Sequence, residues 1–505
     1  MDKIAKFLPF LAWIHEIKDK EILKADLVAG LTVALVLVPQ SMAYAQLAGL
    51  APQYGLYASF LPVMIAALMG SSRQLGTGPV AVVSLLTAAA IPTIIPAGAD
   101  MVTYAAYASL LAFLVGIFQF ALGALKLGMV INFLSHPVVV GFTNAAAIII
   151  GTSQLNKVFG VDKGLGEHTY EQVWGTLVNA TQFTNSWTLF AAIVAFAIMI
   201  GVKKYAPKLP GVLLAVVVTT IISWAMSFGS PVADGGLGGA IVGSIPEGLP
   251  AMIMPNFDFS IINQMVITAI TIGLIGFMEA ISIAKAMAAQ TKQRLDADQE
   301  LMGQGLANVV SSFFQGYAVS GSFSRSAVNI SAGAVTGFSS VVTAVIVGIT
   351  LLWLTPLLYH LPQATLAAVI IMAVINLIKF APIVHAWKVE KHDAIVAVAS
   401  FVLTLLFAPH LENGIVIGVI LSLVLFLYRT MEPRFTELSA HDGSSMFVNA
   451  LDNKLDRCEV VSIVKYSGSL YFANAGYFED KILKLIADKH HCLKYIIVDM
   501  AGINQ

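Results

Sequence analysis

Two charged residues lie in stretches of the sequence where charge is otherwise rare. Glu279 lies within Gly276-Phe-Met-Glu-Ala-Ile-Ser-Ile-Ala284, and Arg325 lies within Ser322-Phe-Ser-Arg-Ser326. A carboxylate in an apolar region tends to take up a proton or to find a partner, since burial disfavours its charged form. Arginine stays charged when it is desolvated and can supply a fixed positive potential. Together these side chains could exchange a proton and attract an anion.

Each of the two residues also has a purely structural interpretation. Glu279 could form a hydrogen bond between helices, and Arg325 could be a cation tied to backbone carbonyls or to Glu279. The elements that position the two residues bear on this choice.

Two apolar segments, near 79–95 and 322–333, are too short and too rich in Gly, Pro or Ser to cross a bilayer. Such segments at corresponding places in the two halves of a chain are typical of a transporter's binding site, because half-helices aim their amino termini at the midplane. The N–H groups and the helix dipole at those termini favour an anion. Ser324 and the N–H groups that follow it are contact candidates on the second segment.

Gly78 and Pro79 open the first short segment. Proline suits a first helical turn, because its missing N–H is not needed there. A Gly-Pro pair is often no more than a helix start, but its place opposite the second segment favours a functional interpretation. The following residues would then offer N–H donors to an anion: Val80, Ala81 and Val82.

The composition is that of a polytopic membrane protein. Hydrophobic residues make up 58% of the chain and charged residues 11%, whereas soluble domains carry roughly 25% charged residues. The net charge of −1 gives no reason to expect a nucleic-acid partner. The first 24 residues are mixed and basic, without the features of a cleavable signal peptide, so we expect the first apolar run to be retained as a span.

Apolar runs of spanning length recur along most of the chain. The candidate spans are residues 25–47, 53–71, 101–124, 130–156, 186–205, 210–228, 260–290, 298–315, 335–356, 363–379, 393–409 and 411–430. With the two short segments they predict an α-helical polytopic protein of about 14 transmembrane segments, which divide as a 7+7 inverted repeat.

The charges of the loops support this count. With the N-terminus inside, the inside loops hold most of the basic residues, among them Arg73, Lys126, Lys203, Lys292 and Lys379. The outside loops hold only Lys157 and Lys163, beside acids such as Asp100 and Asp258. This positive-inside bias predicts a multi-pass protein of the cell inner (plasma) membrane with both termini in the cytoplasm. Lys285 is expected near the cytoplasmic face, with no role toward a substrate.

The character of the sequence changes after about residue 432. Apolar runs at 460–464 and 495–499 flank a helical pattern at 477–487, which predicts β–α–β and the start of a small cytosolic α/β domain. We therefore expect three parts: a cytosolic segment at 1–24, a transmembrane domain at 25–431 and an incomplete α/β domain at 445–505.

The long motif Val38-Pro-Gln-Ser-Met-Ala-Tyr-Ala-Gln-Leu-Ala-Gly-Leu-Ala-Pro-Gln-Tyr-Gly-Leu-Tyr-Ala-Ser-Phe-Leu-Pro62 resembles the signature of the SulP family of sulfate permeases and anion exchangers. Gly70-Ser-Ser-Arg-Gln-Leu-Gly-Thr-Gly-Pro79 and Ser322-Phe-Ser-Arg-Ser326 are similar to the same family, and the C-terminal part resembles its STAS domain. The resemblance implies a core domain of elements 1–4 and 8–11, a gate domain of elements 5–7 and 12–14, and an anion between the third and tenth elements.

The resemblance also implies roles for single residues. It places Gln40 and Tyr44, which share a helix face, at the pocket as a polar contact and an aromatic wall. It favours a supporting role for Arg325 over direct contact with the anion. Glu279 stands where proton-linked symporters of the family also have Glu, and a proton there would remove like-charge repulsion as a divalent anion arrives.

These observations predict a secondary active transporter of a small oxyanion, with sulfate coupled to protons as the first choice. Bicarbonate or a C4-dicarboxylate, sodium coupling, and an anion exchanger or a prestin-like channel stay open. A nucleobase transporter would need a second carboxylate where Ser324 and Arg325 stand. A homodimer and a regulatory protein bound to the STAS domain are further possibilities.

No pattern indicates an enzyme, a nucleotide or a metal. The sequence lacks a Walker A motif and any catalytic constellation, and its ten histidines have no metal-ligand spacing. We expect no cofactor other than a coupling proton or sodium ion.

Overall fold

The computed structural model describes residues 8–501, apart from short gaps at 96–97, 129–134, 167, 207–208, 232–235, 409, 441–446, 453–454 and 490–491. The start of the predicted span at 130–156 and both chain ends therefore lie outside the described residues. The chain forms two compact units, Met1–Gly418 and Val419–Gln505.

The first half of the transmembrane unit is helical except for one short strand. It contains η1 (Pro9–Ala12), η2 (Glu16–Lys18), α2 (Lys20–Leu47), α3 (Pro52–Ala58), α4 (Leu61–Met69), β1 (Gly76–Gly78), α5 (Ala81–Ala90), η3 (Ile91–Thr93), α6 (Met101–Ala124), α7 (His136–Ser153), α8 (Leu155–Phe159), α9 (Thr169–Phe183), α10 (Ser186–Tyr205) and α11 (Gly211–Ala225).

The second half repeats this plan, with one short strand among long helices. It contains α12 (Phe259–Thr291), α13 (Ala297–Phe313), β2 (Ser320–Ser322), α14 (Phe323–Ser331), α15 (Phe338–Ile349), the π-helical turn η6 (Thr350–Leu354), η7 (Thr355–Leu358), α16 (Gln363–Ile375), α17 (Ala381–Val389), α18 (Lys391–Phe407) and α19 (Leu411–Met431).

Several long helices begin at the polar residue that the sequence supplies for capping. The Asp100 carboxylate accepts a hydrogen bond from the Thr103 amide at the start of α6, and Asp258 and Asp296 act in the same way at α12 and α13. Such caps satisfy N–H groups that the first turn leaves without partners. They explain why the predicted boundaries of these helices agree with the structure to within a few residues.

Within the described residues, eight helices are long and apolar enough to cross a membrane, and three shorter apolar helices accompany them. The chain is thus a helical membrane protein, as the composition predicts, while the count of about 14 segments stays a prediction. The shorter helices include α5, which lies in the first of the two interrupted segments.

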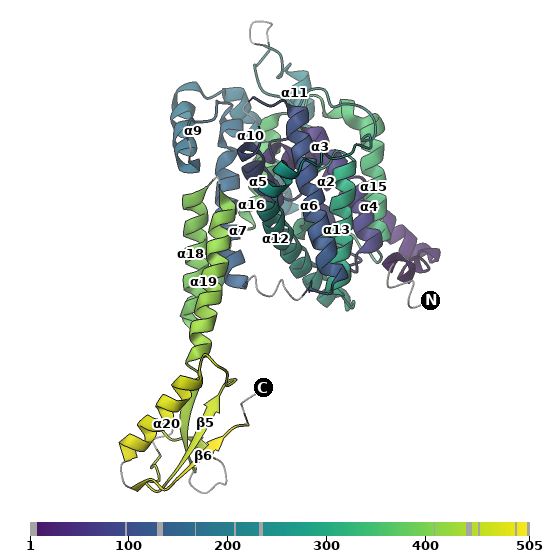
Figure 1. The fold of residues 1–505 in the computed structure, drawn as a ribbon. Coiled ribbons are helices and arrows are strands. Elements are labelled where there is room, and N and C mark those ends of the chain that lie inside the picture. Colours follow the sequence, from purple (N-terminus) through teal and green to yellow (C-terminus); the bar gives the residue numbers. More distant parts are fainter. Residues whose placement is uncertain are drawn as a thin grey trace. The chain divides into compact units, whose positions relative to one another are not determined.

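The helices of the transmembrane unit pack as two groups. In one group α2, α4, α6, α12, α13, α14 and α15 contact one another, and Figure 1 shows α6, α12 and α13 side by side. In the other group α7, α8, α10, α11, α16 and α18 contact one another. Apart from α5 and α19, these groups correspond to the elements that the family resemblance assigns to a core and a gate domain. α5, the third element, contacts α2 and α12 of the first group and α7 of the second.

The second unit carries a four-stranded sheet in the order β4-β3-β5-β6. Its elements are β3 (Arg434–Ala440), β4 (Phe447–Asn449), β5 (Val461–Ser467), α20 (Ala475–Lys489) and β6 (Tyr495–Asp499). β5 and β6 pair in parallel, with α20 between them in the chain, so the predicted β–α–β unit is confirmed. The sheet begins with β3 at Arg434, earlier than residue 445, because β3 pairs with both β4 and β5.

Candidate functional site

The two interrupted segments meet through their first residues. β1 and β2 form an antiparallel pair in which Gly76 faces Ser322, Thr77 faces Gly321, and Gly78 faces Ser320. α5 begins three residues after β1, and α14 begins directly after β2. The amino termini of both half-helices therefore lie next to each other.

Neither half-helix has a side chain that caps its first turn. The N-cap residues Val80 and Ser322 make no side-chain capping bond. The first N–H groups of an α-helix have no partner within the helix, and they carry the positive end of its dipole. Two such ends side by side make a site suited to an anion.

Arg325 lies behind this pair of helix ends. Its side chain is 0% exposed, and Nη1 donates a 2.8 Å hydrogen bond to the carbonyl oxygen of Pro79. Nε and Nη2 are buried without a hydrogen-bond partner among the described residues. The bond to Pro79 agrees with the structural interpretation of Arg325, a cation tied to a backbone carbonyl. Two of its other donors, Nε and Nη2, are not used by the described part of the fold.

Glycines on β1 allow this close approach. A Cβ atom at Gly76 would lie 2.8 Å from Cβ of Arg325, and a Cβ at Gly78 would lie 3.4 Å from its Nη2. Gly78 also has a φ of 141°, in the region that side chains rarely adopt. The motif Gly76-Thr-Gly78 is therefore needed for packing against α14.

A cavity of about 1130 Å³ lies between the two groups of helices. Seven of the residues predicted for the site line it: Gln40, Tyr44, Val80, Ala81, Val82, Glu279 and Ser324. Gly78 and Arg325 do not line it. The structure thus brings the predicted contact residues together around one space and leaves the guanidinium behind the wall.

Glu279 joins the site from α12. Its Oε2 atom is buried without a hydrogen-bond partner among the described residues, as is Oε1 of Gln40. Glu279 and Tyr44 both interact electrostatically with Arg325. The cavity therefore holds a titratable carboxylate within the field of a fixed cation, with no salt bridge between them in the described part of the chain.

Three lysines also line the cavity: Lys203, Lys285 and Lys379. Lys379 Nζ lies 5.9 Å from the ring centroid of Phe323, which is exposed beside Ser324. Lys285 was predicted to have no role toward a substrate, and the structure places it on the wall of the cavity. The fold supplies this positive lining by bringing together α10, α12 and the loop between α16 and α17.

From the sequence we did not predict Tyr317, a buried tyrosine that contacts α5. The hydroxyl of Tyr317 lies 3.0 Å from Oγ of Ser84 on α5, and its ring is fully buried. Tyr317 also interacts electrostatically with Arg325 and Tyr44. From the sequence we also did not predict three buried polar residues on one face of α13: Glu300, Gln304 and Asn308. Their spacing of four within a predicted span could have identified them.

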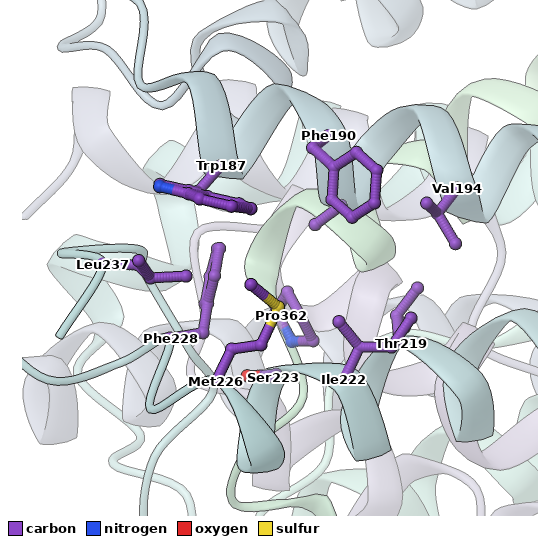
Figure 2. A pocket seen from close by; sticks show the side chains of 11 residues that line it. Trp187, Phe190, Val194, Thr219, Ile222, Ser223, Met226, Phe228, Leu237 and Pro362 are labelled. Carbon is purple, nitrogen blue, oxygen red and sulfur yellow. The ribbon is translucent and has the colours of Figure 1, made fainter.

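A second hollow, between α10 and α11, has a different character. Figure 2 shows Trp187 and Phe190 of α10 across from Ile222, Met226 and other apolar side chains. No charged residue lines it, and the hydroxyl of Ser223 is its buried polar group without a partner among the described residues. Nothing in this hollow could balance an anion.

The sequence decides the family. Residues 23–400 match the profile described as "Sulfate permease family", and residues 454–505 match the STAS domain. The chain belongs to the sulfate permease family. It is 37% identical over 502 residues to the "Probable sulfate transporter 4.2" of Arabidopsis thaliana, an alignment that covers 97% of this chain and 72% of that protein.

Solved structures of two other anion transporters share the sulfate permease fold of this chain. Murine Solute Carrier 26 family member A9, described as an anion transporter in the inward-facing state, is 26% identical with a TM-score of 0.88, covering 100% of this chain and 84% of that one. The transmembrane domain of the cyanobacterium bicarbonate transporter BicA is 26% identical with a TM-score of 0.67, covering 80% and 98%. The chain is thus an anion transporter of the membrane.

Proposed function

We propose that this protein is a secondary active transporter that moves a small oxyanion, sulfate in the first place, together with protons by alternating access. The observation that carries the proposal is the meeting of two uncapped helix amino termini in front of a buried arginine, on a cavity that also contains the carboxylate of Glu279. An anion site next to a titratable acid suits a proton-linked carrier.

The donors around the cavity suit an oxyanion. Backbone N–H groups after Val80 and Ser322, the Ser324 hydroxyl and the Gln40 amide can each donate to a separate oxygen. Arg325 adds a positive potential from behind the wall without occupying the space. A tetrahedral dianion would thus replace its hydration shell with fixed donors.

Glu279 would control when a dianion can bind. An ionised carboxylate on the same cavity repels the anion, and a proton on Glu279 removes this repulsion. Its Oε2 has no hydrogen-bond partner within the described fold. Binding of a proton and binding of the anion would therefore favour each other, which is the basis of symport.

The cavity's place between the two helix groups supports alternating access. Gln40, Glu279 and Ser324 belong to one group, and Thr143 and Met372 belong to the other. If the basic loops lie inside, Lys203 and Lys379 mark the cytoplasmic end of the cavity. Toward the other side, Lys157 Nζ on α8 donates a 3.0 Å hydrogen bond to Gln46 Oε1 on α2, which joins the groups.

We place the transporter in the plasma membrane with both termini in the cytoplasm, on the strength of the charge bias of the loops. The STAS domain would then face the cytosol, where it could bind a regulatory protein or a second copy of the chain. Proteolysis of right-side-out and inverted membrane vesicles would test this topology, since the STAS domain should be cleaved only in inverted vesicles.

Uptake by reconstituted proteoliposomes tests the function. Labelled sulfate, bicarbonate and fumarate are offered in turn, each with and without a pH or a sodium gradient. We expect sulfate uptake that an inward proton gradient accelerates and a sodium gradient leaves unchanged. Sodium-driven uptake of bicarbonate or fumarate would show that the proposed substrate, sulfate, and the proposed coupling ion, the proton, are both wrong. A current above transporter turnover would establish a channel.

A further inference from the structure

We propose that helix α13 positions the anion site, through a row of three buried polar side chains that hold both interrupted segments in register. The row consists of Glu300, Gln304 and Asn308, which we call the α13 polar row. None of the three lines the cavity, so they are positioning residues rather than ligands. The inference rests on the proposed function, because it concerns the affinity of the same anion site.

The spacing of the row places its members on one face of the helix. Residues four apart in an α-helix lie one above the other, and the exposed fractions of Glu300, Gln304 and Asn308 are 1%, 1% and 0%. Burying a polar group without a partner costs about 1–3 kcal/mol. Three such residues in a row therefore need partners, and most of these partners lie in the stretches that lead into the two interrupted segments.

Asn308 holds the segment that leads into β2. Its Oδ1 accepts a 2.7 Å hydrogen bond from the amide of Val319, and its Nδ2 donates to the carbonyl of Val319 at 3.2 Å. Nδ2 also donates to Oε1 of Gln119 on α6 at 2.9 Å, which fixes the orientation of the side-chain amide. Asn308 thus binds both backbone groups of the residue before the strand.

Gln304 and Glu300 hold the segment that leads into β1. Nε2 of Gln304 donates a 2.9 Å bond to Oγ1 of Thr77, the residue that faces Gly321 across the strand pair. Oε2 of Glu300 accepts from the amides of Ser71 and Ser72 at 2.8 and 2.9 Å. One helix face therefore binds both partners of the β1–β2 pair.

The strand pair depends on such anchors because it is too short to hold itself. Two isolated strands are marginally stable even at hairpin length, and these strands have three residues each. The first turns of α5 and α14 follow within a few residues, so any slip of one strand would move Val80 and Ser324 relative to each other. Anion affinity requires both sets of donors to reach one ligand.

The test compares transport by the full-length protein and its variants in proteoliposomes. Asn308→Ala should raise the KM of the transported anion about tenfold or more and reduce discrimination between anions, with a smaller effect on the maximal rate. Asn308→Asp keeps the acceptor for the Val319 amide and loses the donor to the Val319 carbonyl. Its KM should therefore lie between that of the unaltered protein and that of Asn308→Ala.

Asp26→Ala is the matched control. Asp26 is equally buried, and its carboxylate accepts from the amides of Val335 and Thr336 at 2.8 and 3.1 Å, in the loop before α15. It does not line the cavity. We expect it to lower thermal stability as much as Asn308→Ala does, while the KM stays that of the unaltered protein.

An unchanged KM in Asn308→Ala, with a loss of stability like that of Asp26→Ala, would overturn the inference and leave the row a structural device. If Asn308→Ala does not insert, Thr77→Val makes the same test by removing the acceptor for Gln304. Absence of any anion transport by the unaltered protein would overturn the proposed function instead, so the two failures are distinguishable.

Discussion

Arg325 on the second half-helix donates a hydrogen bond of 2.8 Å to the carbonyl of Pro79, two residues before the first half-helix begins. A single guanidinium thus joins the starts of two segments that lie 246 positions apart. Nε and Nη2 have no partner in the described part of the fold, so this hydrogen bond leaves two donors of the buried guanidinium unused.

Replacing Arg325 should separate its structural role, the bond to Pro79, from its proposed role as a positive charge for the anion. Arg325→Gln removes the charge, and we expect the KM for sulfate uptake to rise about tenfold or more while the protein still inserts. Arg325→Lys keeps a charge but lacks the planar fork, so its loss should be smaller. Arg73→Gln, which breaks a half-exposed pair with Glu16, is the control and should leave the KM unchanged. An unchanged KM in folded Arg325→Gln would contradict a role in binding.

Removing the carboxyl of Glu279 should uncouple transport from protons. Glu279→Gln keeps the size of the side chain and cannot titrate, so sulfate uptake should no longer respond to an inward pH gradient. The measurement is the uptake rate with and without that gradient in proteoliposomes, beside Glu16→Gln as a control. Full acceleration by the gradient in Glu279→Gln would rule out proton coupling at this residue.

Adding one methyl group at Gly76 should disturb the site without changing any charge. The Cβ of Gly76→Ala would lie 2.8 Å from Cβ of Arg325, next to the backbone of α14, so the half-helix must shift. Overpacking of this kind costs about 1–3 kcal/mol. Gly201→Ala on α10, whose Cβ would meet nothing within 4 Å, is the control. The thermal unfolding temperature and the KM should change in Gly76→Ala only. If both variants behave alike, residue 76 and Arg325 are not tightly packed.

The STAS sheet should respond to acid through Glu437 on β3. Burial raises the pKa of Glu437, but hydrogen bonds from Lys489 and Ser462 and the charges of Lys489 and Arg457 outweigh it and hold the pKa below its ordinary value. The stability that this carboxylate contributes is therefore complete above the unfolded pKa of about 4.3. It is lost as the pH falls toward the lower folded pKa.

Hydrogen exchange of the β3 and β5 amides in the full-length protein, followed from about pH 6 to pH 3, measures this loss. For a partly exposed cluster we expect roughly 1 kcal/mol or less. Glu437→Gln should remove this contribution, whereas Glu479→Gln on the exposed face of α20 should retain it. The same acid response in Glu437→Gln would assign the effect to another group.

The sequence alone was sufficient for much of the fold. The apolar runs predicted α6 and α10 at their observed bounds, because a bilayer span needs a continuous apolar helix of fixed length and polar residues mark its ends. The strand β3 was not predicted, since it is recognised only by its pairing with β4 and β5. Strand pairing depends on distant residues that local patterns do not report.

For the site, the sequence was sufficient to predict which residues carry the chemistry. Glu279, Arg325, Gln40 and Ser324 are unusual where they stand, because a polar or charged group in a span is costly unless it has a function. Only the tertiary structure decided where each one lies relative to the others. It placed Arg325 behind the wall, Glu279 on the cavity and the α13 polar row at the strand pair. Those relations join residues more than 200 positions apart, and only packing in three dimensions sets such distances.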